Sequence, residues 1–184
     1  MKTVADILRW TPYLSDEQIA ELKAVAVPAR IGQKEAPQSL ANISLEDLYQ
    51  LESISAEKGV FFAIGSVLLG MTDEETLKAP AMEMLGLRNM VVAEQDRIAA
   101  LFAQLEREPS AAETLAGVEN LNFGFFGLAD WYARRMHITD HDVAFRTPWA
   151  RIWQCRKNDL DTQEYQERVR KAERQLSQAG APTR

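Results

Sequence analysis

NLNFGFFGLADWYARRMHITDHDVAFRTPWARIWQCRK, residues 120–157, is the stretch around which the rest of the chain must pack. It holds three of the four tryptophans, both histidines and the only cysteine. Aromatic side chains carry large apolar surfaces, so a dense group of them on short helices has to be covered by the chain's own core or by a partner. The interpretation of the whole sequence therefore depends on which of these side chains face inward.

Within this stretch the pattern predicts three short helices, at residues 120–136, 140–145 and 148–157. The side chains expected to cap them are Asn120 or Asn122, Thr139 and Thr147. Gly124 and Gly127 fall inside the first helix, where a glycine costs about 1 kcal/mol relative to alanine. We expect these two glycines to allow the close approach of another backbone.

Outside this stretch, apolar residues recur mostly with helical spacing. The predicted helices are residues 3–11, 16–26, 44–55, 56–69, 73–79, 81–106 and 110–116, and Gly86 with Asn89 allows a break near the start of the helix at residues 81–106. Residues 27–43 are interrupted by two prolines and a glycine, and are predicted to form a loop that is either a mobile connection or the place of a small hairpin.

The last helix is predicted to begin at Asp161. Its apolar positions are Tyr165, Val169, Ala172 and Leu176, spaced four, three and four residues apart. Such a narrow seam is typical of a helix that docks on one partner helix, although two heptads are too few to define a coiled coil.

These patterns predict an all-α fold, an irregular multi-helix bundle with a helical C-terminal extension. Residues 1–157 are expected to form one helical domain, with a sub-boundary near residues 107–119. Residues 158–184 are expected to form an amphipathic helix followed by a disordered tail.

The net charge of −6 is unevenly distributed. Residues 151–184 carry eight basic and five acidic side chains, which leaves 13 basic and 22 acidic side chains, a net charge of −9, in residues 1–150. An acidic body argues against nucleic acid as the main partner, because phosphate contacts need a basic face.

Several features favour a cytoplasmic, reducing environment. The single cysteine excludes an internal disulfide, and the N-terminal residues hold no apolar run long enough for a signal peptide. The longest apolar run, residues 59–71, is shorter than the roughly 20 residues that a membrane crossing needs. We therefore expect no membrane association.

His137, His141 and Cys155 are the residues with metal-binding or nucleophilic chemistry. A helix start predicted at Thr139 separates the two histidines, so they would not share a helical face. No orienting group or oxyanion hole stands at a recognisable spacing. We expect no catalytic residue, metal or cofactor and no enzymatic activity; a small metal-binding protein or enzyme that uses these three residues is an alternative.

The aromatic residues support two interpretations, which can hold for different members of the set. They can form the core of a C-terminal subdomain, or they can line a docking groove for a helix or another subunit. The candidate partner-binding residues are Phe123, Phe126, Trp149, Trp153, Tyr165 and Val169.

Two segments carry a family resemblance. Residues 43–102, ISLEDLYQLESISAEKGVFFAIGSVLLGMTDEETLKAPAMEMLGLRNMVVAEQDRIAALF, have a helix layout that resembles the tail assembly chaperones of tailed bacteriophages. Residues 127–171 are similar to C-terminal segments of proteins from phages and phage-like elements.

The resemblance implies a non-enzymatic, mainly helical protein in the cytoplasm of an infected cell. Such proteins bind the long, largely helical tape-measure protein and keep it soluble while tail-tube subunits polymerise around it. The implied partners are tape-measure or tail proteins, and a homo-oligomer is compatible with the resemblance. One competing interpretation is a virion component such as a ring-forming head–tail connector. A weaker one is a DNA-binding module with a helix-turn-helix at residues 140–157.

Overall fold

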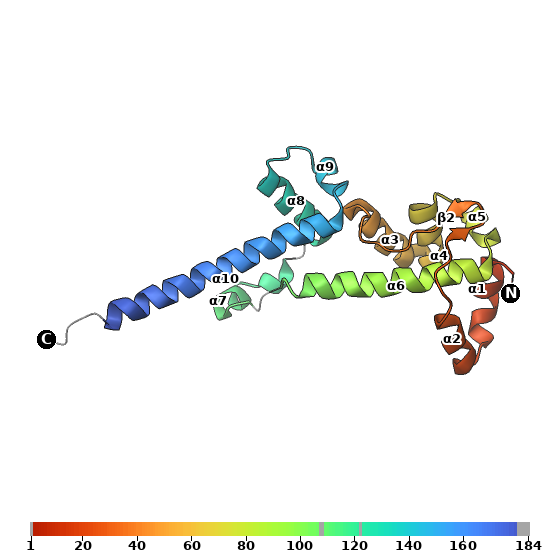
Figure 1. The fold of residues 1–184 in the computed structure, drawn as a ribbon, viewed down its shortest axis with the longest axis horizontal. Helices are drawn as coiled ribbons and strands as arrows, with labels where there is room; N and C mark the ends of the chain where they lie inside the picture. Colours follow the sequence, from red (N-terminus) through yellow and green to blue (C-terminus); the bar gives the residue numbers. More distant parts are fainter. Residues whose placement is uncertain (1, 107–108, 122, 180–184) are drawn as a thin grey trace.

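The structure is a computed structural model that describes residues 2–106, 109–121 and 123–179. Helix accounts for 73% of it, in ten α-helices, and one small two-stranded hairpin is also present. Figure 1 shows an elongated molecule, with the N-terminus at one end and the long helix α10 projecting from the other. The predicted all-α fold with a helical C-terminal extension is confirmed.

The α-helices are α1 (Val4–Trp10), α2 (Asp16–Lys23), α3 (Leu45–Lys58), α4 (Val60–Ala63), α5 (Asp73–Lys78), α6 (Ala81–Ala103), α7 (Ala111–Leu115), α8 (Gly124–Met136), α9 (His141–Phe145) and α10 (Trp149–Ala179). Shorter elements are the 3-10 turns η1 (Thr11–Tyr13) and η3 (Val118–Asn120), the π-helical turn η2 (Ile64–Leu68), and the strands β1 (Arg30–Ile31) and β2 (Lys34–Glu35). The predicted Asn122 cap, two residues of the predicted sub-boundary (107–108) and the tail residues 180–184 lie outside the described part of the chain. The division at residue 157 stays a prediction.

Reciprocal side-chain caps begin five of the helices. In each, a Ser or Thr oxygen accepts from the backbone N–H three residues on, and that residue's side chain accepts from the backbone of the cap. The capping residues are Thr3, Ser15, Ser44, Thr72 and Ser110. Each of these predicted helix starts is therefore confirmed.

Two predicted caps in the aromatic stretch are wrong. Helix α8 begins at Gly124 without a side-chain cap, and Asn120 lies in η3 instead. Helix α9 is capped by Asp140, whose carboxylate accepts from the backbone N–H of Asp142 at 2.9 Å, and not by Thr139. Asp is at least as good a cap as Thr, so the local sequence alone did not separate the two.

The predicted helix break near Ser55 is also wrong. Helix α3 continues to Lys58 and ends at Gly59, whose φ of 98° is a conformation that glycine adopts without steric cost. The apolar segment that follows runs through α4 into the π-helical turn η2 and stops before Gly70.

Helix α10 is continuous over 31 residues, so the separate helix predicted from Asp161 does not exist. The backbone contains no Gly or Pro between residues 149 and 179, and Asn and Asp cost only a fraction of a kcal/mol in a helix interior. Side-chain contacts also bridge the expected gap. Lys157 binds Asp161 at 3.0 Å, and the Thr162 hydroxyl donates to the carbonyl of Asn158 at 2.7 Å.

The N-terminal ends of α3 and α10 are joined by backbone hydrogen bonds. The N–H of Leu45 donates to the carbonyl of Thr147 at 3.0 Å, and the N–H of Trp149 donates to the carbonyl of Ile43 at 3.2 Å. This pairing fixes the start of α10 against α3 and directs Trp149 into the core.

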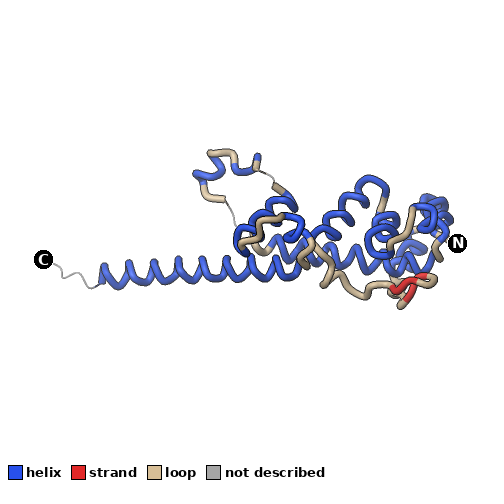
Figure 2. The backbone as a smooth tube through the Cα atoms, turned by 90° about the horizontal axis from the view of Figure 1, so that it is seen from above, coloured by secondary structure: helices blue, strands red, loops and turns tan. Residues whose placement is uncertain are grey.

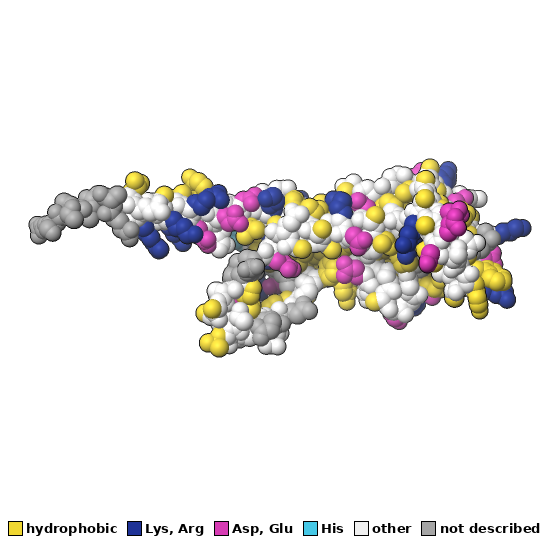
Figure 3. Space-filling view, turned by 90° about the horizontal axis from the view of Figure 1, so that it is seen from below, with side chains coloured by type: hydrophobic (Ala, Val, Ile, Leu, Met, Phe, Trp, Pro, Cys, Tyr) yellow, Lys and Arg dark blue, Asp and Glu magenta, His cyan; other side chains and the backbone are white. Residues whose placement is uncertain are grey.

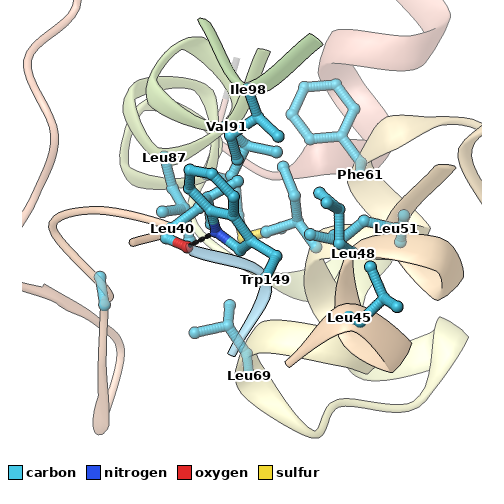
Figure 4. Packing of buried hydrophobic residues seen from close by; sticks show 14 of the residues in the cluster. Leu40, Leu45, Leu48, Leu51, Phe61, Leu69, Leu87, Val91, Ile98 and Trp149 are labelled. Carbon is cyan, nitrogen blue, oxygen red and sulfur yellow. Dashed lines mark hydrogen bonds between the residues drawn. The ribbon is translucent and has the colours of Figure 1, made fainter. Parts of the chain in front are cut away.

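Trp149 lies at the centre of the buried cluster, with only 3% of its surface exposed. Its Nε1–H donates to the carbonyl of Leu40 at 2.7 Å, as the dashed line in Figure 4 shows. The other buried side chains labelled in Figure 4 belong to the same cluster. They are Leu45, Leu48 and Leu51 of α3, Phe61 of α4, Leu87, Val91 and Ile98 of α6, Leu40, and Leu69, which follows η2.

Helix α6 is unbroken, so the break that Gly86 and Asn89 allow is absent. Both residues instead contact α2 or the segment that follows it. A Cβ on Gly86 would lie 2.0 Å from the carbonyl oxygen of Ala26, and the Asn89 side chain donates to the carbonyl of Leu22 at 2.9 Å. The glycine therefore serves close packing between α6 and this segment.

The loop at residues 27–43 contains the hairpin of β1 and β2, drawn in red in Figure 2, so the hairpin alternative is confirmed. The loop is also tied to other elements along its length. The Lys34 ammonium donates to the carbonyls of Leu69 and Gly70, and Ile31 and Leu40 are fully buried.

Glu94 on α6 holds the end of this loop. Its carboxylate accepts from the Ser39 hydroxyl at 3.0 Å, from the Leu40 N–H at 3.3 Å and from Arg97 at 2.8 and 2.9 Å. The hydrogen bonds from Arg97, followed by those from Ser39 and Leu40, lower the pKa of Glu94 to about 2. Glu94 thus supports the same Leu40 whose carbonyl receives Trp149.

We expect this carboxylate to make the fold acid-sensitive. Because the folded pKa lies below the ordinary value of 4.5, the stabilisation is complete above about pH 4.5 and is lost as the pH falls towards 2. Glu94→Gln should lower the free energy of unfolding at pH 7 by about 1.5–3 kcal/mol, the usual value for hydrogen bonds to a charged group. Urea unfolding at pH 7, 5 and 3 measures this.

The variant should also lose less stability than the wild type between pH 5 and pH 3. Glu57→Gln, on the exposed surface of α3, is the control and should change stability by less than about 0.5 kcal/mol. Equal losses of stability with acid in wild type and Glu94→Gln would contradict the assignment.

Candidate functional site

An aromatic groove lies where α3, α8 and α9 meet. Its volume is about 470 Å³. The residues that line it are Tyr49, Phe123, Gly124, Phe125, Phe126 and Phe145. Among the residues that the structure describes, no charged side chain lines this hollow, so its chemistry is that of a site for apolar side chains.

Two predicted partner-binding residues come together here. Phe123 is 67% exposed and Phe126 is 58% exposed, although both are large apolar side chains. Tyr49 of α3 completes the group, with its ring 5.4 Å from that of Phe125. Sequence reasoning missed the role of Tyr49; its position at the edge of the Leu45–Leu48–Leu51 stripe was the available signal.

The Phe126 ring is held by contacts with α9. It stacks on the His141 ring with centroids 5.3 Å apart, and it lies 6.5 Å from the Phe145 ring. The His141 Nε2 is 3.1 Å from the Asp130 carboxylate on α8. This contact, followed by the hydrogen bond from Arg134, lowers the pKa of Asp130. This contact therefore ties α9 to α8 next to the groove.

Glycine is needed at the two positions in α8 for different structural reasons. Gly124 has a φ of 47°, in the left-handed region that disfavours other residues. A Cβ on Gly127 would lie 2.4 Å from the Cβ of Phe123. The predicted approach of another backbone at Gly127 is thus corrected: the close neighbour is the Phe123 side chain, which Gly127 allows to fold over the first turn.

A shallower hollow of about 340 Å³ continues from the groove along α3 and α9. Its polar lining carries charges of both signs, from Glu46, Asp142 and Arg146. Arg146 and Asp142 face each other at 4.0 Å on the exposed surface. The site therefore combines an apolar floor with a charged edge, as protein interfaces do.

The two predicted tryptophans do not line the groove. Trp149 is a core residue and offers no surface to a partner. Trp153 is half-buried, and its Nε1–H donates to the carbonyl of Leu101 at 2.9 Å, which joins α10 to α6. Both indoles therefore help to hold α10 in place. The burial of Trp149 leaves it no surface for a partner, whereas the partner-binding role of Trp153 stays a prediction.

Tyr165 and Val169 lie on the part of α10 that projects away from the body, here called the arm (residues 164–179). Tyr165 is 61% exposed and Leu176 is 73% exposed. Figures 1 and 2 both show the arm extending beyond every other element, and Figure 3 shows basic and acidic side chains interspersed along it. The apolar seam of the arm is thus a surface separate from the groove.

His137, His141 and Cys155 are not assembled into a site. His137 ends α8 in the left-handed conformation with φ of 55°, while His141 is engaged with Asp130 and Phe126. In the described ranges, no three His, Cys, Asp or Glu side chains are grouped in a way that could hold a metal ion.

No helix within the described residues has the length and apolar content that a membrane crossing requires. Comparisons with protein-family models, with curated proteins and with solved structures found no match.

Proposed function

We propose that this protein is a non-enzymatic assembly protein that binds an apolar helix face of a long helical partner, in the manner of a phage tail assembly chaperone acting on a tape-measure protein. The observation that carries the proposal is the pair of exposed phenylalanines, Phe123 and Phe126, held at the mouth of the aromatic groove.

The groove suits a helix for two reasons. An amphipathic helix presents side chains at intervals of three and four residues, which insert together into one apolar hollow. The groove is also arranged before binding, because the His141–Asp130 contact and the Phe126 stack hold its wall. A preformed site loses less conformational entropy on binding than a flexible one.

The identity of the partner rests on the family resemblance of residues 43–102 and 127–171. A tape-measure protein exposes long apolar helix faces until the tail tube surrounds it. A binding protein that covers these faces would prevent their aggregation.

The groove is tested by a double substitution, Phe123→Ala with Phe126→Ala. Truncation of a hot-spot aromatic costs about 2 kcal/mol or more, so the double variant should bind the partner about 100-fold more weakly or worse. Labelled synthetic helices from the tape-measure-type protein of the same genome serve as probes, and fluorescence anisotropy measures their affinity.

The matched control removes two exposed aromatic residues elsewhere, Trp10→Ala with Tyr13→Ala; these are 49% and 78% exposed. It should retain wild-type affinity, and both double variants should keep the wild-type circular dichroism spectrum. Equal losses in the two variants, or no binding of any helix by wild type, would overturn the proposal. A large closed ring in light scattering, without a client, would favour the ring-forming virion component instead.

A further inference from the structure

A second hollow lies at the other end of the molecule, between α1, η1, α2, the start of α4 and α6. Its volume is about 470 Å³, within the roughly 300–1,000 Å³ range of small-molecule sites. The residues of its apolar floor are Ile7, Phe61 and Leu85, each at most 7% exposed. Leu8 and Leu22 contribute to its walls. Because several elements surround it, the hollow suits an inserted chain better than a docked helix.

The polar groups of this hollow are mostly satisfied within the protein. The Asn89 amide donates to Leu22 at 2.9 Å, and the Thr11 hydroxyl donates to Ile7 at 2.7 Å. These two polar side chains are therefore occupied within the protein, and the buried lining is apolar, which favours a hydrocarbon chain.

The charged lining residues are all cationic, namely Lys23, Lys58 and Arg88. This contrasts with the body, whose residues 1–150 carry a net charge of −9. Lys58 faces Asp73 at 3.2 Å, but Arg88 bonds only the neighbouring Asn89, at 3.3 Å, among described residues. Lys23 is exposed on α2. A positive edge around an apolar floor is complementary to an anionic amphiphile.

We propose that this hollow, here called the cationic pocket, binds a single-chain amphiphile with a carboxylate head group, such as a fatty acid. The chain would lie on Ile7, Phe61 and Leu85, and the carboxylate would face Lys23 and Arg88. This proposal is independent of the aromatic groove and of the function proposed from it.

The probe is decanoate, measured by isothermal titration calorimetry below its micelle concentration. Decyltrimethylammonium has the same chain with the opposite head charge. Wild type is expected to bind one decanoate about 10-fold more tightly than decyltrimethylammonium, since the exposed cations attract the carboxylate and repel the ammonium head group. Raising the salt concentration should bring the two affinities closer together, because salt screens the attraction between the carboxylate and partly exposed cations.

Lys23→Gln with Arg88→Gln should weaken decanoate binding about 10-fold and leave decyltrimethylammonium unchanged or slightly tighter. The control, Lys171→Gln with Arg174→Gln on the arm, removes the same charge far from the pocket and should bind decanoate like wild type. Leu8→Glu places an acid at the pocket, where Leu8 is 44% exposed, and should also weaken decanoate binding without unfolding the chain.

Three outcomes would overturn the proposal. These are no saturable decanoate binding to wild type, equal affinity for the two head groups, or equal losses of affinity in the pocket variant and the arm control. Thermal unfolding of each variant, followed by circular dichroism, shows that the compared proteins are folded.

Discussion

Trp149→Ala is expected to lower the free energy of unfolding by about 3–5 kcal/mol, the range for removing a buried aromatic side chain from a core. The indole is 3% exposed and lies among side chains from three helices, so its loss leaves a cavity that these helices cannot easily fill. The substitution also removes the donor to Leu40. Equilibrium urea unfolding measures the change.

Trp149→Phe separates packing from hydrogen bonding. It keeps a ring in the core but removes Nε1–H, while the Leu40 carbonyl retains its longer bond from the Ile43 N–H at 3.3 Å. We therefore expect a smaller loss, about 1 kcal/mol from the hydrogen bond together with some lost packing. Trp10→Ala is the control, because this indole is 49% exposed. If Trp149→Ala costs no more than Trp10→Ala, the central role of Trp149 is wrong.

Gly86→Ala is expected to destabilise the protein by about 1–3 kcal/mol, although alanine is the better helix former. The new Cβ would lie 2.0 Å from the Ala26 carbonyl oxygen and 3.2 Å from Pro28 Cδ. The neighbour is backbone, which cannot rotate away, so the segment after α2 has to move from α6. Displacement of this segment should also weaken the Asn89–Leu22 hydrogen bond.

Whether Gly86→Ala raises or lowers stability tests whether Ala26 packs on Gly86. Ala93 lies on the exposed face of the same helix, and Ala93→Gly should cost about 1 kcal/mol from helix propensity alone. Propensity alone would make Gly86→Ala stabilising by a similar amount. Destabilisation by both substitutions, seen as lower urea midpoints, supports the packing of Ala26 on Gly86. A rise in the midpoint of Gly86→Ala would refute it.

The local sequence was sufficient to predict those helix starts that are set by contacts within a few residues. Thr3, Ser15, Ser44, Thr72 and Ser110 each satisfy the first N–H groups of the helix that follows, so these starts could be predicted. The all-α fold followed from the same evidence together with helical periodicity.

Sequence reasoning could not separate the aromatic residues that face inward from those that face outward. From the sequence, Phe126 and Trp149 are both predicted to lie on short amphipathic helices, but only Trp149 is buried. The difference arises from the backbone pairing of Ile43 and Leu45 with residues 147–149, which joins segments about a hundred residues apart. Periodicity within one helix does not contain this information.

Long-range contacts also decide what the local sequence leaves open around α6. Locally, Gly86 allows a helix break, and residues 27–43 are compatible with a mobile connection as well as with a hairpin. In the folded chain the glycine receives the backbone at Ala26, and Glu94 and Lys34 anchor the loop. The local sequence around these residues does not reveal their contacts, because each contacting residue is distant in sequence.

The projecting arm governs how the molecule diffuses. Helix α10 has 31 residues and, at about 1.5 Å per residue, is about 46 Å long, and its outer half is free of the body. Such a rod raises the frictional coefficient, so a monomer of 20.8 kDa should elute from a sizing column as a heavier globular protein would. Removing residues 164–184 should reduce the Stokes radius more than the lost mass alone predicts.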